Sequence, residues 1–170
     1  MFSYVGWAKS LIVVLVLVLS ACTTSSIKNN ERIVDNNSNN AATVYFIRPT
    51  PIRTRGMADN DIKIEIDKNL AAKLSSGEYI ALNIKPGKTE ITLRSYTYLT
   101  SKPMPEEVFR SAEFDFETGK SYIIHTRFTQ EEYRGIYYTP EEIDAIQAKK
   151  LLSRLKPHGS LAKAKPIDVL

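Results

Sequence analysis

The strongest indication of fold class in this 170-residue chain is Ile62-Lys63-Ile64-Glu65-Ile66-Asp67 (IKIEID). Three isoleucines alternate with charged residues, so one face of the segment is apolar and the other polar, as in a half-buried strand. Asp67-Lys68-Asn69 supplies turn residues, and residues 71–74 predict a short return strand. This hairpin pattern indicates an antiparallel sheet.

Similar patterns flank the hairpin along the chain. Residues 44–47 (VYFI) are fully apolar, which predicts a strand buried on both faces. Alternating residues between turn signals predict further strands near residues 79–84, 89–93, 113–117 and 122–128. About seven short strands with turns between them predict a mostly β protein, an antiparallel β-sandwich.

One C-terminal helix is expected over residues 140–155. Thr139-Pro140-Glu141-Glu142 has the pattern of a capping box with proline at the first helical position, and an apolar stripe follows it. We expect this helix to cover an edge or end of the sandwich, with a partner-binding helix as the alternative. The sandwich and helix together would occupy residues 41–156, and residues 157–170 would form a basic, mostly disordered tail.

The start of the chain carries a targeting pattern. Nine uncharged apolar residues, 11–19, follow Lys9 and are too few for a membrane span of about 20 residues. With the small residues that follow, they match a secretory signal peptide. The ending Leu19, Ser20, Ala21, Cys22 resembles the lipobox of bacterial lipoproteins, which implies a signal peptide over residues 1–21 and acyl chains, palmitate among them, on Cys22. An ordinary signal peptide with a chance cysteine, or an uncleaved anchor, are the alternatives.

The residues after Cys22 bear on where the domain would be displayed. Residues 23–40 include six asparagines, three serines and no aromatic residue, which predicts that residues 22–40 are a lipidated cysteine and a flexible tether. Thr23 follows the cysteine in place of an acidic residue. By resemblance to enterobacterial sorting, this favours the outer membrane with the domain facing the periplasm, and leaves the inner membrane and the cell surface open.

Charge and residue types exclude several classes of function. The formal net charge is +4, well short of the footprint of a nucleic-acid-binding protein, although contact with anionic lipids or glycans is permitted. Two histidines and one cysteine give no set of zinc ligands, and His125 fits a structural strand position. With no catalytic motif in the chain, we expect no metal, no cofactor besides the lipid on Cys22, and no enzymatic activity.

Two clusters of side chains are candidates for binding. Three arginines surround two prolines in residues 48–56 and could hold a phosphate or carboxylate group, with an ordinary charged surface loop as the alternative. They are Arg48, Arg53 and Arg55. Five tyrosines could stack on sugars or anchor a protein, or could simply cover the edge of a core. They are Tyr96, Tyr98, Tyr133, Tyr137 and Tyr138.

A longer pattern resembles a known family. Residues 43–49 (TVYFIRP) and 62–93 (IKIEIDKNLAAKLSSGEYIALNIKPGKTEITL) resemble the bacterial lipoproteins of domain of unknown function 2846, and the middle of the pattern is similar to PEGA-like β modules. The turn is Pro86-Gly87-Lys88 here in place of Pro-Glu-Gly-Ala. The resemblance implies a small β-sandwich at the cell envelope and transfers no catalytic residues.

These observations predict a non-catalytic, membrane-anchored lipoprotein that binds or scaffolds at the bacterial cell envelope. Its expected partners are the membrane, through the lipid, and an envelope protein. A module that binds peptidoglycan or lipopolysaccharide is the alternative.

The lipid on Cys22 can be tested by intact mass. Protein extracted from host membranes should begin at Cys22 and carry the added mass of acyl chains, and a Cys22→Ser variant should lack both features. An unmodified thiol, or a retained leader, would contradict the assignment.

Overall fold

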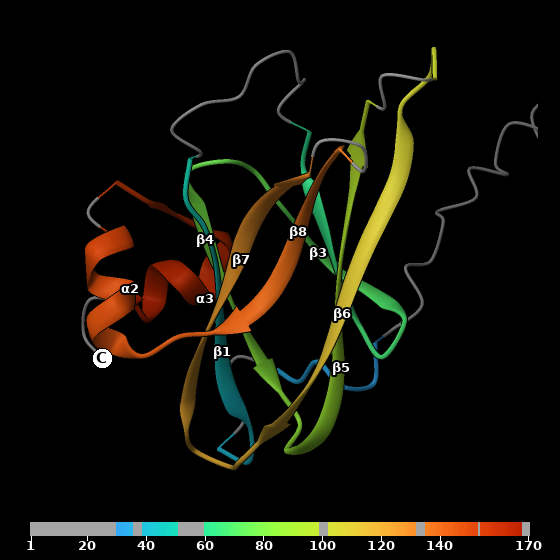
Figure 1. The fold of residues 1–170 in the computed structure, drawn as a ribbon. Helices are drawn as coiled ribbons and strands as arrows, with labels where there is room; N and C mark the ends of the chain where they lie inside the picture. The colour runs from blue at the N-terminus through green and yellow to red at the C-terminus, as the bar shows by residue number, and fades with distance from the viewer. Residues whose placement is uncertain are drawn as a thin grey trace, which may run out of the picture.

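The computed structural model describes residues 30–35, 39–50, 60–98, 102–131, 135–152 and 154–167. Within this part of the chain, a five-stranded sheet lies between a four-stranded sheet and a layer of two short helices (Figure 1). None of the described helices is long and apolar enough to cross a membrane. The elements are β1 (Ala42–Arg48), β2 (Ile62–Ile66), β3 (Asn69–Leu74), β4 (Glu78–Ile84), β5 (Gly87–Thr97), β6 (Glu106–Phe116), β7 (Ser121–Glu131), β8 (Gly135–Glu142), α2 (Ala145–Leu152), β9 (Lys156–His158) and α3 (Gly159–Ala164).

Strand β1 is the centre of the five-stranded sheet, whose order is β8-β7-β1-β4-β9. As expected for an apolar run, β1 is buried on both faces. Val44 and Phe46 point into the core between the sheets, and Tyr45 and Ile47 into a second core under the helices. A strand of this kind needs cover on both sides, since no polar face is available for solvent.

The four-stranded sheet has the order β3-β2-β5-β6 and is antiparallel throughout. The IKIEID prediction is confirmed: Ile62, Ile64 and Ile66 are fully buried, while Lys63 and Glu65 lie on the outer face. Asp67 and Lys68 both have positive φ, 48° and 66°, which is the twist that a two-residue hairpin turn requires.

The fold differs from the predicted seven-stranded antiparallel sandwich in strand number and direction. The seven expected strands correspond to β1–β7, but β8 and β9 were not expected. The five-stranded sheet is mixed, because β1 pairs in parallel with β7, and β4 with β9. Strand patterns carry no signal for pairing direction across a long chain separation, so this feature depends on the tertiary structure.

The prediction of a helix over 140–155 was wrong in its first turn. The observed helix, α2, is only half as long as the predicted one. Residues 139–142 end strand β8, where Pro140 lies opposite Thr126 of β7. Proline is tolerated there because β8 is an edge strand. The helix that does form, α2, begins after Asp144, whose Oδ1 accepts a hydrogen bond of 2.7 Å from the Gln147 amide and so caps it.

Residues 157–167 of the tail that was expected to be mostly disordered instead complete the second core. Strand β9 adds to the edge of β4, and α3 follows it directly. Leu161, Ala162 and Ile167 are buried against the sheet, and the Tyr45 hydroxyl donates to the Lys165 carbonyl at 3.2 Å. The basic residues of this segment lie on its exposed side, which is why its composition alone resembles that of a disordered tail.

We therefore expect Leu161→Ala to lower the free energy of unfolding by about 2–4 kcal/mol, since it leaves a cavity in the second core. Urea denaturation of the full chain measures this, with the exposed Lys165→Ala as the matched control. Equal stability of the two variants would contradict the packing of α3.

Candidate functional site

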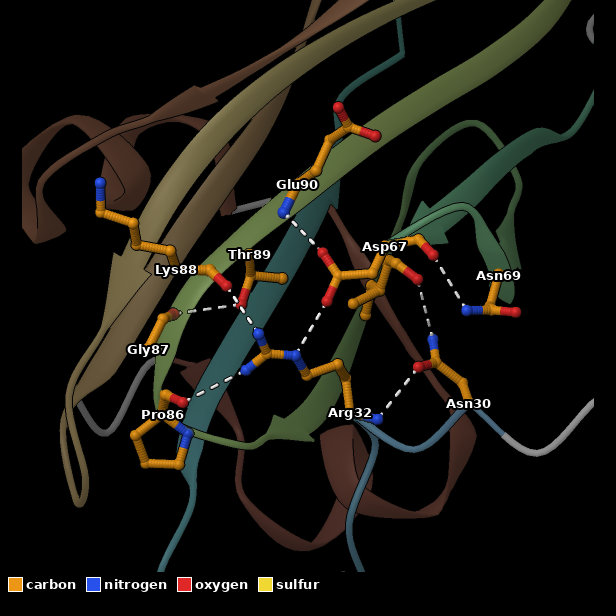
Figure 2. Close-up of polar contacts among 10 residues, drawn as sticks. Asn30, Arg32, Asp67, Asn69, Pro86, Gly87, Lys88, Thr89 and Glu90 are labelled. Atoms are coloured by element: carbon orange, nitrogen blue, oxygen red, sulfur yellow. Dashed lines mark hydrogen bonds and ion pairs between the residues drawn. The ribbon is translucent and has the colours of Figure 1, made fainter.

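The N-terminal segment Asn30–Asp35, expected to be part of a flexible tether, is docked on the base of the sandwich. Arg32 holds it there (Figure 2). Its Nε donates to Asp67 Oδ2 at 2.8 Å, its Nη1 to the Pro86 carbonyl at 3.2 Å, and its Nη2 to the Lys88 carbonyl at 2.8 Å. A guanidinium has donors in a fixed fork, so three acceptors from two different turns define one orientation of the segment.

Asp67 is itself held in place by the sheet. Its Oδ1 accepts from the Glu90 amide at 2.9 Å (Figure 2), and its own amide donates to the Glu90 carbonyl at 2.9 Å. The left-handed turn of the β2–β3 hairpin thus presents a carboxylate that bridges strand β5 and the N-terminal segment.

Backbone and apolar contacts complete the docking. The Val34 amide donates to the Asn83 carbonyl and the Lys85 amide to the Arg32 carbonyl, at 3.0 and 2.9 Å. Asn30 is buried and donates to the Ile66 carbonyl at 3.3 Å, while Ile33 packs against the core between the sheets. The described residues 30–35 are therefore packed on the domain, which extends to earlier residues than the predicted boundary at residue 41.

Arg48, the first arginine of the predicted fork at residues 48–56, is buried and only 1% exposed. Its Nη1 donates to the Leu74 carbonyl at 2.8 Å and its Nη2 to the Tyr138 hydroxyl at 3.1 Å. The guanidinium carbon also lies 5.0 Å from the centre of the Tyr138 ring. Arg48 thus serves the core, and Arg53 and Arg55 lie outside the described residues.

The five candidate tyrosines do not form one surface. Tyr137 and Tyr138 are buried, and Tyr133 lies outside the described residues. Tyr96 and Tyr98 are 38% and 50% exposed at the far end of β5. They line a shallow hollow of about 400 Å³ whose other lining residues are mostly polar. These other residues are Asn60, Asp61, Lys63, Lys73 and Pro105.

Two further exposed apolar side chains belong to the same end of the β5–β6 hairpin. Phe109 is 53% exposed on β6, opposite Arg94, and Met104 is 71% exposed just before β6 begins. We call Tyr96, Tyr98, Met104 and Phe109 the hairpin surface. Exposed large apolar side chains grouped in this way mark contact sites more often than scattered ones do.

Charged side chains on the same outer sheet face hold the aromatic rings in place. Arg94 makes two bonds to Glu65, from Nε at 2.8 Å and Nη2 at 2.9 Å, and its carbon lies 4.9 Å from the Phe109 ring centre. Lys63 Nζ lies 5.3 Å from the Tyr96 ring centre. Such cation–π contacts restrict the rings before any partner binds.

Glu107 completes this network and is unsuited to act as a general acid. The Lys63 ammonium donates to it at 3.0 Å and lowers the pKa of the Glu107 carboxyl, and Arg94 lies 3.3 Å away on its other oxygen. A carboxyl that donates a proton in catalysis near neutral pH needs the opposite shift, an elevated pKa.

His125 lies on the helix-facing side of β7 and is more than half-buried. Burial is the main factor that lowers the pKa of its imidazole. Among the described residues, no group of three or more histidine, cysteine or acidic side chains is arranged to hold a metal ion.

Phe109 and Arg32 were missed at the level of sequence. Phe109 lies an odd number of residues before Phe114 and Phe116, which face inward. Because successive side chains of a strand point to opposite faces, alternation alone puts Phe109 on the outer face. Nothing in the local sequence distinguishes Arg32, because its acceptors come from turns 35 to 56 residues away.

Comparison with known proteins found no match: no family model, no curated protein and no solved structure corresponds to this chain. The resemblance to domain of unknown function 2846 therefore stays a prediction.

Removal of the guanidinium should release the docked segment. We expect Arg32→Ala to speed hydrogen exchange at the Val34 and Lys85 amides by about 5- to 30-fold, the effect of roughly 1–2 kcal/mol. Arg127→Ala, which removes a surface arginine paired with Glu141, should leave both amides unchanged. Unaltered exchange at Val34 in the Arg32 variant would show that the backbone contacts suffice.

Proposed function

We propose that this protein is a non-catalytic, lipid-anchored binding module of the bacterial cell envelope, and that the hairpin surface contacts a protein partner. The observation that carries the proposal is the position of the hairpin surface at the opposite end of the sandwich from the docked N-terminal segment. Arg32 binds the Lys88 carbonyl at one end of β5, and Tyr96 lies eight residues further along the same strand. At about 3.4 Å per residue, these two points are about 27 Å apart.

The docked segment limits how far the domain can stand from an anchor. If Cys22 carries the lipid, eight Cα–Cα steps separate it from Asn30 and can span at most about 28 Å. The base of the sandwich would then stay near the membrane, and the hairpin surface would point away from it. A partner in the periplasm, or in the facing envelope layer, is the natural target of a surface so placed.

The chemistry of the hairpin surface supports a binding role. Tyrosine, phenylalanine and methionine are enriched in the cores of protein interfaces, and arginine next to them supplies directional hydrogen bonds. The two carboxylates nearby, Glu65 and Glu107, are each paired with basic groups, which favours recognition over acid–base catalysis.

A photo-crosslinking experiment in the host tests the protein contact. A benzophenone amino acid at Phe109 in the full chain should give one discrete crosslinked species. The same group at Asp115, exposed on the same face of β6 but near the base, should not. The Phe109 crosslink should disappear when Tyr96 and Tyr98 are both changed to alanine. Equal crosslinking at both sites, or none at Phe109, would contradict the proposal.

The hollow beside Tyr96 and Tyr98 favours a glycan as the second candidate, since aromatic rings next to Asn60, Asp61 and lysines are suited to a sugar. In that case the full chain should cosediment with purified peptidoglycan. Tyr98→Ala should reduce this binding and Phe109→Ala should leave it largely intact, because Phe109 does not line the hollow. A protein contact predicts different results: no cosedimentation with peptidoglycan, and loss of the Phe109 crosslink when Tyr96 and Tyr98 are both changed to alanine.

A further inference from the structure

A cavity of about 620 Å³ lies in the second core, between the helical layer and the five-stranded sheet. Its lining comes from both sides: from β4 and β7 of the sheet, and from α2, β9, α3 and the residues beside them. The lining residues are Tyr79, Ile123, Ala145, Ala148, Lys149, Leu152, Leu155, Pro157, Ala162, Lys163, Pro166 and Ile167.

The deep part of this cavity is apolar. Ile123 and Ile167 are buried in its wall, and the two helices meet it with the small residues Ala148 and Ala162, both fully buried. Protein interiors have few voids larger than a water molecule, whereas pockets that hold small ligands measure about 300–1,000 Å³. The small side chains therefore leave space of a size suited to a ligand.

The mouth of the cavity is positively charged. Lys149 on α2 and Lys163 on α3 are exposed and are the only charged residues among the described residues of the lining. The whole segment from residue 145 to residue 167 contains six lysines and arginines and no acidic residue. A ligand that enters past these two ammonium groups is favoured if it carries an anionic group.

We propose that this cavity binds a single-chain anionic amphiphile of the long-chain fatty acid class, independently of the hairpin surface. The acyl tail lies between Ile123 and the two helices, and the carboxylate lies between Lys149 and Lys163. Burial of the tail supplies most of the affinity, at a rate of roughly fourfold in the binding constant for each methylene taken out of water. The lysines select the negative head group.

Photolabelling of the full chain tests this site. Protein purified from its host is reconstituted in phospholipid vesicles and exposed to palmitic acid that carries a diazirine in its tail. Labels mapped by mass spectrometry should fall on cavity residues such as Leu152 and Ile123. Ile146 is an internal control, because it is 74% exposed on α2 but does not line the cavity. Labels that favour Ile146 would indicate adsorption to the lipid surface and would overturn the proposal.

Two matched pairs of variants sharpen the result. Ala145→Trp fills the exposed mouth and should reduce labelling of Leu152 by about tenfold or more, while Gln147→Trp on the same helix should not. The double variant Lys149→Glu/Lys163→Glu should reduce labelling of Leu152 by about fivefold. Its control, Lys150→Glu/Lys165→Glu, makes the same change of charge outside the cavity lining and should not reduce labelling. All four lysines in these charge variants are exposed, so their substitution should leave the fold intact. They therefore test the site even if Ala145→Trp perturbs folding.

Residues 168–170 would be the competing occupant. Asp168-Val169-Leu170 directly follow Ile167, which lines the cavity. Labelling of the cavity that appears only after these three residues are deleted would assign the space to the C-terminus, and would overturn the proposal. Labelling of the intact chain that depends on Lys149 and Lys163 would support it.

Discussion

Strand β1 has no polar face, and the layered arrangement of the domain follows from this. Val44 and Phe46 require an apolar layer on one side, and Tyr45 and Ile47 require another on the opposite side. A two-layer sandwich would leave one of these pairs in water. The four-stranded sheet covers the first pair, and the helical layer with residues 156–167 covers the second. Residues 156–167 are folded because they help to bury the apolar side chains on the helix-facing side of β1.

Asp67 and Arg32 form the second organising interaction. The left-handed β2–β3 turn places the Asp67 carboxylate where it bonds both strand β5 and the guanidinium of Arg32. Arg32 in turn binds carbonyls of residues 86 and 88, at the start of β5. One ion pair thus joins the hairpin turn, the β4–β5 turn and the entering chain. The two ends of the sandwich therefore differ: the N-terminal segment is docked at one end, and the exposed side chains of the hairpin surface lie at the other.

The two candidate binding regions differ in their chemistry and in their layer. The hairpin surface lies on the outer face of the four-stranded sheet, where cations and carboxylates are balanced and the aromatic rings are exposed. The cavity lies on the opposite side of the central sheet, under the helical layer. The charged residues of this layer, among the described residues 145–152 and 154–167, are all basic. Because the two regions share no residue, substitutions in one should leave binding at the other intact, which allows the two proposals to be tested separately.

The amino-acid sequence alone predicted the β class, the strands β1–β7, the faces of IKIEID and the double-sided burial of β1, because alternation and apolar runs are local signals. It could not determine the pairing of β1 with β7, since parallel pairing joins residues about 80 positions apart. It was misleading at residues 139–142, where strand pairing with β7 overrode a helix-start pattern. It was also misleading at residues 30–35 and 157–167, whose polar composition hides a few buried residues. Only the tertiary structure buried Arg48 and separated the tyrosines, because the neighbours that surround a side chain come from distant parts of the chain.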